Sequence, residues 1–152
     1  MDDVVARKVS VKLENIFEDD IAKQRFVLVE GAPGAGKNTL AWHICQKWEC
    51  GELFQEFRVV IFVQLRDPAI QEAKSLVELL PTENEKMASD VVAQISACRG
   101  QGVLFVVDSW DELPVQYHKD SIFETLICHP GSLNLHLSTI LITSRPIASG
   151  KL

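Results

Sequence analysis

A seven-residue segment rich in glycine constrains the fold of this chain more than any other feature. The segment reads Gly31-Ala32-Pro33-Gly34-Ala35-Gly36-Lys37. It follows an apolar run that ends before Glu30, and an amphipathic segment begins near Lys37. The glycines allow backbone angles and close approaches that a Cβ would block, so successive N–H groups can point at one anion. A strand, such a loop and a helix in immediate succession are typical of a P-loop, which binds phosphate.

Apolar runs alternate along the chain with segments of helical spacing. The runs are continuous, which is typical of parallel strands covered by helices on both faces; they comprise residues 26–29, 59–65, 103–107 and 139–143. Apolar residues at helical spacing predict one helix that begins near Lys37 and two more over residues 86–98 and 117–128. We therefore predict an α/β fold in which a parallel sheet carries helices on both faces, in three α/β/α layers.

Composition narrows the class of protein. The chain has 152 residues, 47% hydrophobic and 24% charged, a balance that predicts one globular domain. Its net charge of −6, without a cluster of Lys and Arg, argues against a nucleic-acid partner. No apolar run approaches the roughly 20 residues that cross a bilayer, and the first residues lack a secretory signal, so we expect a cytoplasmic protein with no membrane partner. We interpret the four cysteines, which form no Cys-x-x-Cys pair, as small buried residues that remain reduced.

The residues at the end of the loop bear on how a nucleotide and its metal ion would be held. Lys37 supplies a charge for the β- and γ-phosphates, and the start of the helix adds free N–H groups. A P-loop continues with Ser or Thr, whose hydroxyl ligates Mg²⁺, but here Asn38 follows and Thr39 comes one place later. One helical step turns by about 100°, so Thr39 cannot simply replace that ligand. The neutral side-chain oxygen of Asn38 is a weaker candidate, at a loss of about 1.5–3 kcal/mol. We expect binding to survive and hydrolysis to be weak or absent.

Acidic residues follow the third apolar run. Asp108 stands at its carboxyl end, where open parallel sheets bind ligands, and is a candidate to hold hydrated Mg²⁺. Asp111 and Glu112 lie on the next loop, within reach of a water molecule aimed at the γ-phosphate. Arg145 follows the last run at the same edge, where its guanidinium is a candidate to sense or stabilise the terminal phosphate, although a salt bridge is an equal alternative.

These motifs, taken in order, resemble those of a NACHT domain, the nucleotide-binding module of NOD-like receptors and a P-loop NTPase of the ASCE and STAND type. The resemblance covers roughly residues 24–147 and rests on the P-loop, on Leu65-Arg66-Asp67, on Val-Val-Asp-Ser-Trp-Asp-Glu-Leu-Pro and on Ile-Thr-Ser-Arg-Pro. It implies ATP or ADP with Mg²⁺ as ligands. By the same resemblance Gly36, Lys37 and Thr39 bind phosphate, Asp108 holds Mg²⁺, Asp111 and Glu112 belong to the hydrolytic site, and Arg145 is the first sensor.

The resemblance also implies an organisation and partners. Residues 1–23 are expected to form a lead-in segment, and 24–152 a NACHT-like domain that is truncated after its fourth strand. Effector domains, sensor domains and oligomer partners are implied for the full-length context. The chain departs from the family pattern at Asn38 and, more mildly, at Ser109, which takes a place often held by Gly.

Four functions remain open at this point. The favoured one is a nucleotide-dependent switch in innate-immune or cell-death signalling, at most a slow ATPase. A P-loop kinase or other phosphotransferase would need an Arg-rich lid, which the sequence lacks. A GTPase is disfavoured because no Asn-Lys-x-Asp motif occurs. A degenerate scaffold that binds no nucleotide is the last alternative, and Asn38 is the residue that favours it.

Overall fold

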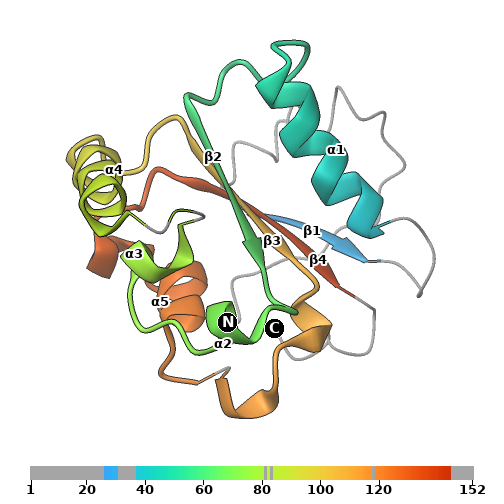
Figure 1. Ribbon diagram of the computed structural model, residues 1–152, viewed down its shortest axis with the longest axis vertical. Coiled ribbons are helices and arrows are strands. Elements are labelled where there is room, and N and C mark those ends of the chain that lie inside the picture. The colour runs from blue at the N-terminus through green and yellow to red at the C-terminus, as the bar shows by residue number, and fades with distance from the viewer. Residues whose placement is uncertain (1–25, 31–36, 81, 83, 118, 145–152) are drawn as a thin grey trace.

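The computed structural model describes residues 26–30, 37–80, 82, 84–117 and 119–144 (Figure 1). Over these residues the chain forms one parallel sheet of four strands in the order β1-β4-β3-β2. The strands are β1 (Phe26–Glu30), β2 (Val59–Gln64), β3 (Val103–Asp108) and β4 (Thr139–Ser144). Each of the four apolar runs is therefore a strand, and the predicted parallel sheet is confirmed.

Helices cover both faces of this sheet (Figure 1). One face packs against α1 (Lys37–Glu49), and the other against α3 (Leu76–Leu79), α4 (Glu85–Ala97) and α5 (Ile122–Cys128). The short helix α2 (Pro68–Gln71) directly follows β2, and single 3-10 turns form η3 (Trp110–Glu112), η4 (Val115–Tyr117) and η5 (Pro130–Leu133). The result is the three-layer α/β/α arrangement expected from the sequence.

Strand β3 shows why the apolar runs are continuous. All six of its residues are buried, because successive side chains point to opposite faces and both faces are covered. Val103, Phe105 and Val107 join the cluster beneath α3, α4 and α5, whereas Leu104 and Val106 join the cluster beneath α1. The two apolar cores are therefore separated by the sheet itself.

The predicted helix over residues 117–128 is wrong in its first half. The chain instead forms η4, passes through Asp120 at a φ of 56°, and begins α5 only after Ser121. Ser121 accepts a hydrogen bond at its side-chain oxygen from the backbone N–H of Glu124 at 3.2 Å, which caps the first turn. The left-handed residue and the cap together place the helix start five residues later than the apolar spacing indicated.

One expectation about the cysteines also needs correction, and one large apolar side chain is exposed. Trp42 is 55% exposed on α1, and its ring lies against that of His43 at a centroid distance of 5.5 Å. Cys50 is exposed rather than buried, while Cys45, Cys98 and Cys128 are partly buried. The first 23 residues lie outside the described part of the chain. No helix in the described residues is long and apolar enough to cross a membrane.

Candidate nucleotide site

The carboxyl ends of the parallel strands meet at one edge of the sheet, where β1 ends at Glu30, β3 at Asp108 and β4 at Ser144. Helix α1 starts at Lys37, beside the end of β1 (Figure 1). This start is where the sequence predicted it. The backbone of Lys37, Asn38 and Thr39 forms the first turn of α1, whereas residues 31–36 and Arg145 lie outside the described residues.

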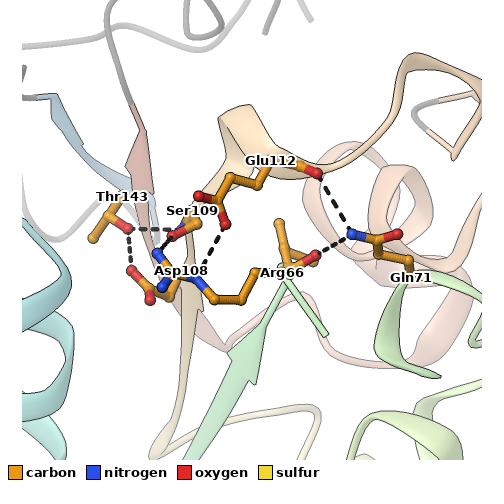
Figure 2. A network of polar contacts seen from close by, with 7 residues as sticks. Arg66, Gln71, Asp108, Ser109, Glu112 and Thr143 are labelled. Carbon is orange, nitrogen blue, oxygen red and sulfur yellow. Dashed lines mark hydrogen bonds and ion pairs between the residues drawn. The ribbon is translucent and has the colours of Figure 1, made fainter. Parts of the chain in front are cut away.

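Asp108 is held in a fixed orientation by Thr143 on the neighbouring strand (Figure 2). The hydroxyl of Thr143 donates to Oδ1 of Asp108 at 2.6 Å, and the hydroxyl oxygen of Thr143 accepts from the backbone N–H of Ser109 at 2.9 Å. Asp108 is only 2% exposed and Thr143 is fully buried. The Thr143 hydroxyl is thus fixed by two hydrogen bonds, and it fixes the Asp108 carboxylate at the sheet edge. Such a carboxylate suits a metal ligand, because Mg²⁺ prefers oxygen donors in a rigid geometry.

Ser109 turns the chain away from the sheet. Its φ of 69° and ψ of 52° lie in the left-handed region, which costs a residue with a Cβ more than it costs glycine. This explains the expectation that glycine is common at this place. The turn leads into η3, where Trp110 is 4% exposed and packs in the core beneath the acidic residues. Trp110 is therefore a packing residue.

The two acidic residues of η3 differ in their surroundings. Asp111 is half-buried, whereas the side chain of Glu112 is 40% exposed and forms an ion pair with Arg66. Oε2 of Glu112 lies 3.0 Å from Nε of Arg66, and Nη2 of Arg66 donates to the Ser109 hydroxyl at 3.4 Å. The acidic loop is therefore joined to the chain that follows β2 (Figure 2).

Gln71 on α2 adds a second connection from the same side. Its side-chain amide donates to the backbone carbonyl of Leu65 at 2.8 Å and to that of Glu112 at 3.5 Å. The backbone N–H of Leu65 also donates to the carbonyl of Asp108 at 3.1 Å. The segment after β3 is thus held from both neighbours, by residues after β2 on one side and by Thr143 of β4 on the other.

Three contributors to this network received no role from the sequence. Arg66 and Thr143 entered only as parts of family motifs, and Gln71 was not singled out. Their contacts depend on strand order and register, because β2 pairs with β3 so that Gln64 lies opposite Asp108. The only sequence signal for Arg66 and Thr143 was a charged or hydroxyl residue near the carboxyl end of an apolar run.

The negative charge of Asp108 affects the thiol of Cys45 on α1, the helix that packs against the sheet. The pKa of Cys45 on α1 is raised to about 11, first by burial of the thiol and then by the negative charges of Asp108 and Glu49. The thiol is therefore neutral at physiological pH and acts as a small apolar side chain. Among the described residues no group of three or more His, Cys, Asp or Glu could hold a metal ion by itself.

Comparison with known proteins identifies the class of domain. The family model described as the NACHT domain matches residues 25–152. The chain belongs to the NACHT family. The NACHT match spans all four strands, and the parallel sheet with helices on both faces is that of a P-loop NTPase.

Curated relatives of this NACHT domain are far longer than the chain. It is 28% identical to the NACHT, LRR and PYD domains-containing protein 3 of Rattus norvegicus, over 94% of the chain and 15% of that protein. It is 31% identical to the NACHT, LRR and PYD domains-containing protein 1a allele 5 of the same species, over 67% of the chain and 8% of that protein. It is 35% identical to the NACHT, LRR and PYD domains-containing protein 5 of Mus musculus, over 62% and 8%. The chain therefore spans less than a sixth of each of these relatives.

Proposed function

We propose that residues 24–152 form a NACHT-like domain that binds ATP and ADP with Mg²⁺ and acts as a nucleotide-dependent switch, with residues 1–23 as a lead-in segment. One observation carries the proposal most strongly. A buried, oriented Asp108 ends β3 at the sheet edge beside which α1 begins at Lys37. A helix start after a glycine-rich loop binds phosphate, and a carboxylate at that edge suits the metal that accompanies it.

Specific residues take each part of this task. The backbone of residues 31–39 and the ammonium group of Lys37 hold the phosphates, and Asp108 holds the metal with a weaker contribution from Asn38. When bound, Mg²⁺ supplies positive charge that neutralises the phosphate oxygens. Its other oxygen ligands would come from the nucleotide and water, which is the usual arrangement for this ion.

Hydrolysis is proposed to be slow or absent. Asp111 and Glu112 would orient the attacking water molecule and accept its proton, and Arg145 would contact the terminal phosphate. Asn38 in place of Ser or Thr removes one ligand from the metal. A domain that holds its nucleotide for long periods suits a switch better than an enzyme of high turnover, because occupancy itself is then the signal.

The wider role is proposed from the family. The relatives carry in their names LRR and PYD domains besides the NACHT domain. By analogy the switch would work in the cytoplasm, in innate-immune or cell-death signalling, by changing how the domain meets effector domains, sensor domains and further copies.

The proposal is tested by calorimetric titration of the full chain with ATP, ADP, GTP and GDP, each with and without Mg²⁺. We expect adenine nucleotides to bind more tightly than guanine nucleotides, and Lys37→Ala to abolish binding because the phosphate charge loses its partner. Equal affinity for both bases would overturn the adenine-specific switch. The alternative favoured by Asn38, a scaffold that binds no nucleotide, predicts no heat of binding with any of the four.

A further inference from the structure

We propose that Arg66 is a positioning residue for Glu112, which it holds on the acidic loop through a contact that a lysine could not reproduce. This inference rests on the proposed function, because Glu112 matters only if the domain binds and slowly hydrolyses ATP. It assigns to Arg66 a task within that site, the orientation of the group that accepts a proton from water.

The first support is that Arg66 uses two different atoms of its guanidinium. Nε contacts Oε2 of Glu112 at 3.0 Å, while Nη2 donates to the hydroxyl of Ser109 at 3.4 Å. These atoms belong to one rigid plane, so the two contacts together fix where the guanidinium lies. The Glu112 carboxylate is thereby placed relative to Ser109, the first residue after Asp108 (Figure 2).

The second support is that the backbone of Glu112 is held from the same side as its carboxylate. Gln71 donates to the Glu112 carbonyl and to that of Leu65 with one amide nitrogen. The side chain and the main chain of Glu112 are thus both connected to residues 65–71. The side chain of Asp108 is in addition oriented from β4 by Thr143.

The third support is the partial exposure of the pair. The side chains of Arg66 and Glu112 are 45% and 40% exposed, and half-exposed ion pairs contribute little to the stability of the fold. Their contact therefore acts mainly on orientation. Removal of Arg66 is expected to leave the domain folded, which makes a kinetic change interpretable.

Glu112 takes part in the hydrolysis step as the acceptor of a water proton. The oxygen of a water molecule bonds to the terminal phosphorus of ATP, the bond from that phosphorus to the bridging oxygen breaks, and one water proton passes to the Glu112 carboxylate. ADP and inorganic phosphate leave. A carboxylate that swings freely would seldom be within hydrogen-bond reach of that proton.

The test compares four chains by single-turnover ATP hydrolysis and by ATP titration: the unchanged chain, Arg66→Ala, Arg66→Lys and Arg58→Ala. We expect Arg66→Ala to lower the rate about tenfold at unchanged Kd for ATP, and Arg66→Lys to lower it as well, because an ammonium group lacks the rigid plane that makes both contacts. Arg58 is the matched control, since it is exposed at the opposite end of β2 and donates to the Gln101 carbonyl at 3.0 Å. A loss of ATP affinity as large as the loss of rate, or an equal loss in Arg58→Ala, would overturn the proposal.

A double-variant cycle and a measurement without nucleotide complete the test. Arg66→Ala should slow hydrolysis no further in a chain that carries Glu112→Gln, and additive losses would contradict the inference. Without nucleotide, Arg66→Ala should speed hydrogen exchange at the N–H groups of Glu112 and Leu113, which donate within η3. Unchanged exchange there would also overturn it. If the unchanged chain binds no ATP, the proposed function fails, whereas a failure of this inference alone leaves ATP titration normal and exchange unaltered.

Discussion

Thr143 donates its hydroxyl to Oδ1 of Asp108 at 2.6 Å, across two neighbouring strands and out of contact with solvent. The same hydroxyl oxygen accepts the backbone N–H of Ser109 at 2.9 Å. One small side chain therefore sets both the orientation of the candidate metal ligand and the course of the chain after it.

Thr143→Val keeps the shape of the side chain and removes its hydrogen bonds. We expect the free energy of unfolding to fall by about 1–3 kcal/mol, because buried polar groups lose a partner. ATP affinity in the presence of Mg²⁺ should fall as well, since Asp108 is no longer oriented. Urea denaturation and calorimetry measure the two effects. Thr143→Ser, which retains the hydroxyl, is the control, and an equal loss of Mg²⁺-dependent affinity in both variants would count against the hydrogen bond.

Asn38→Ser restores the hydroxyl that a P-loop places on the metal ion. The expected result is a gain of roughly ten- to hundredfold in Mg²⁺-dependent ATP affinity, which corresponds to the contact that Asn38 lacks. Turnover should rise with it. Titration with and without Mg²⁺ and a phosphate-release assay measure both quantities, and Asn38→Ala controls for the mere loss of the amide. No change in either quantity would show that Asn38 does not limit the site.

Ser109 offers a separate test of backbone strain. Its φ of 69° favours glycine, so Ser109→Gly should be more stable than Ser109→Ala by about 1 kcal/mol. Both variants lose the hydroxyl that accepts from Arg66, so the difference between them isolates the backbone term. Thermal or urea denaturation of the pair measures it. Equal stability would mean that the left-handed conformation costs nothing at this position.

Cys45 should be alkylated more slowly than the exposed Cys50. Because the pKa of Cys45 is raised to about 11 from 9.0, its thiol stays neutral and should resist alkylation at about pH 8.5, where the thiol of the exposed Cys50 reacts. The same shift favours the folded state below pH 9 and is lost as the pH rises toward 11. Mass spectrometry after iodoacetamide treatment reports each cysteine, and equally fast labelling of both would contradict the shift.

The strands could be predicted from the sequence because their physical cause is local. A run such as residues 103–107 is apolar without interruption, and only a strand covered on both faces needs that pattern. The start of α1 at Lys37 was also predictable, since a glycine-rich loop and an amphipathic segment meet there. The start of α5 was not. It depends on a cap at Ser121 and a left-handed Asp120, which override the apolar spacing.

Only those residues of the candidate site that end a strand could be predicted from the sequence. Asp108 ends an apolar run, so its place at the sheet edge follows from the run itself. The partnership of Asp108 with Thr143, and that of Arg66 with Glu112, join residues 35 and more apart in the chain. Such pairs are set by strand order and register, which no single segment of the sequence encodes. Glu112 was therefore assigned a task while the side chain that holds it was not.

The strand order determines when the sheet can form during synthesis of the chain. Strand β4 lies between β1 and β3, so the strand before the phosphate loop and the strand that ends in Asp108 are both synthesised before the strand that joins them. Until residues 139–144 leave the ribosome, β1 has no sheet partner among the described strands, and Asp108 has no Thr143. A nascent chain would hold both halves of the candidate site without uniting them, and a bound nucleotide would begin to favour the folded form only after β4 emerges.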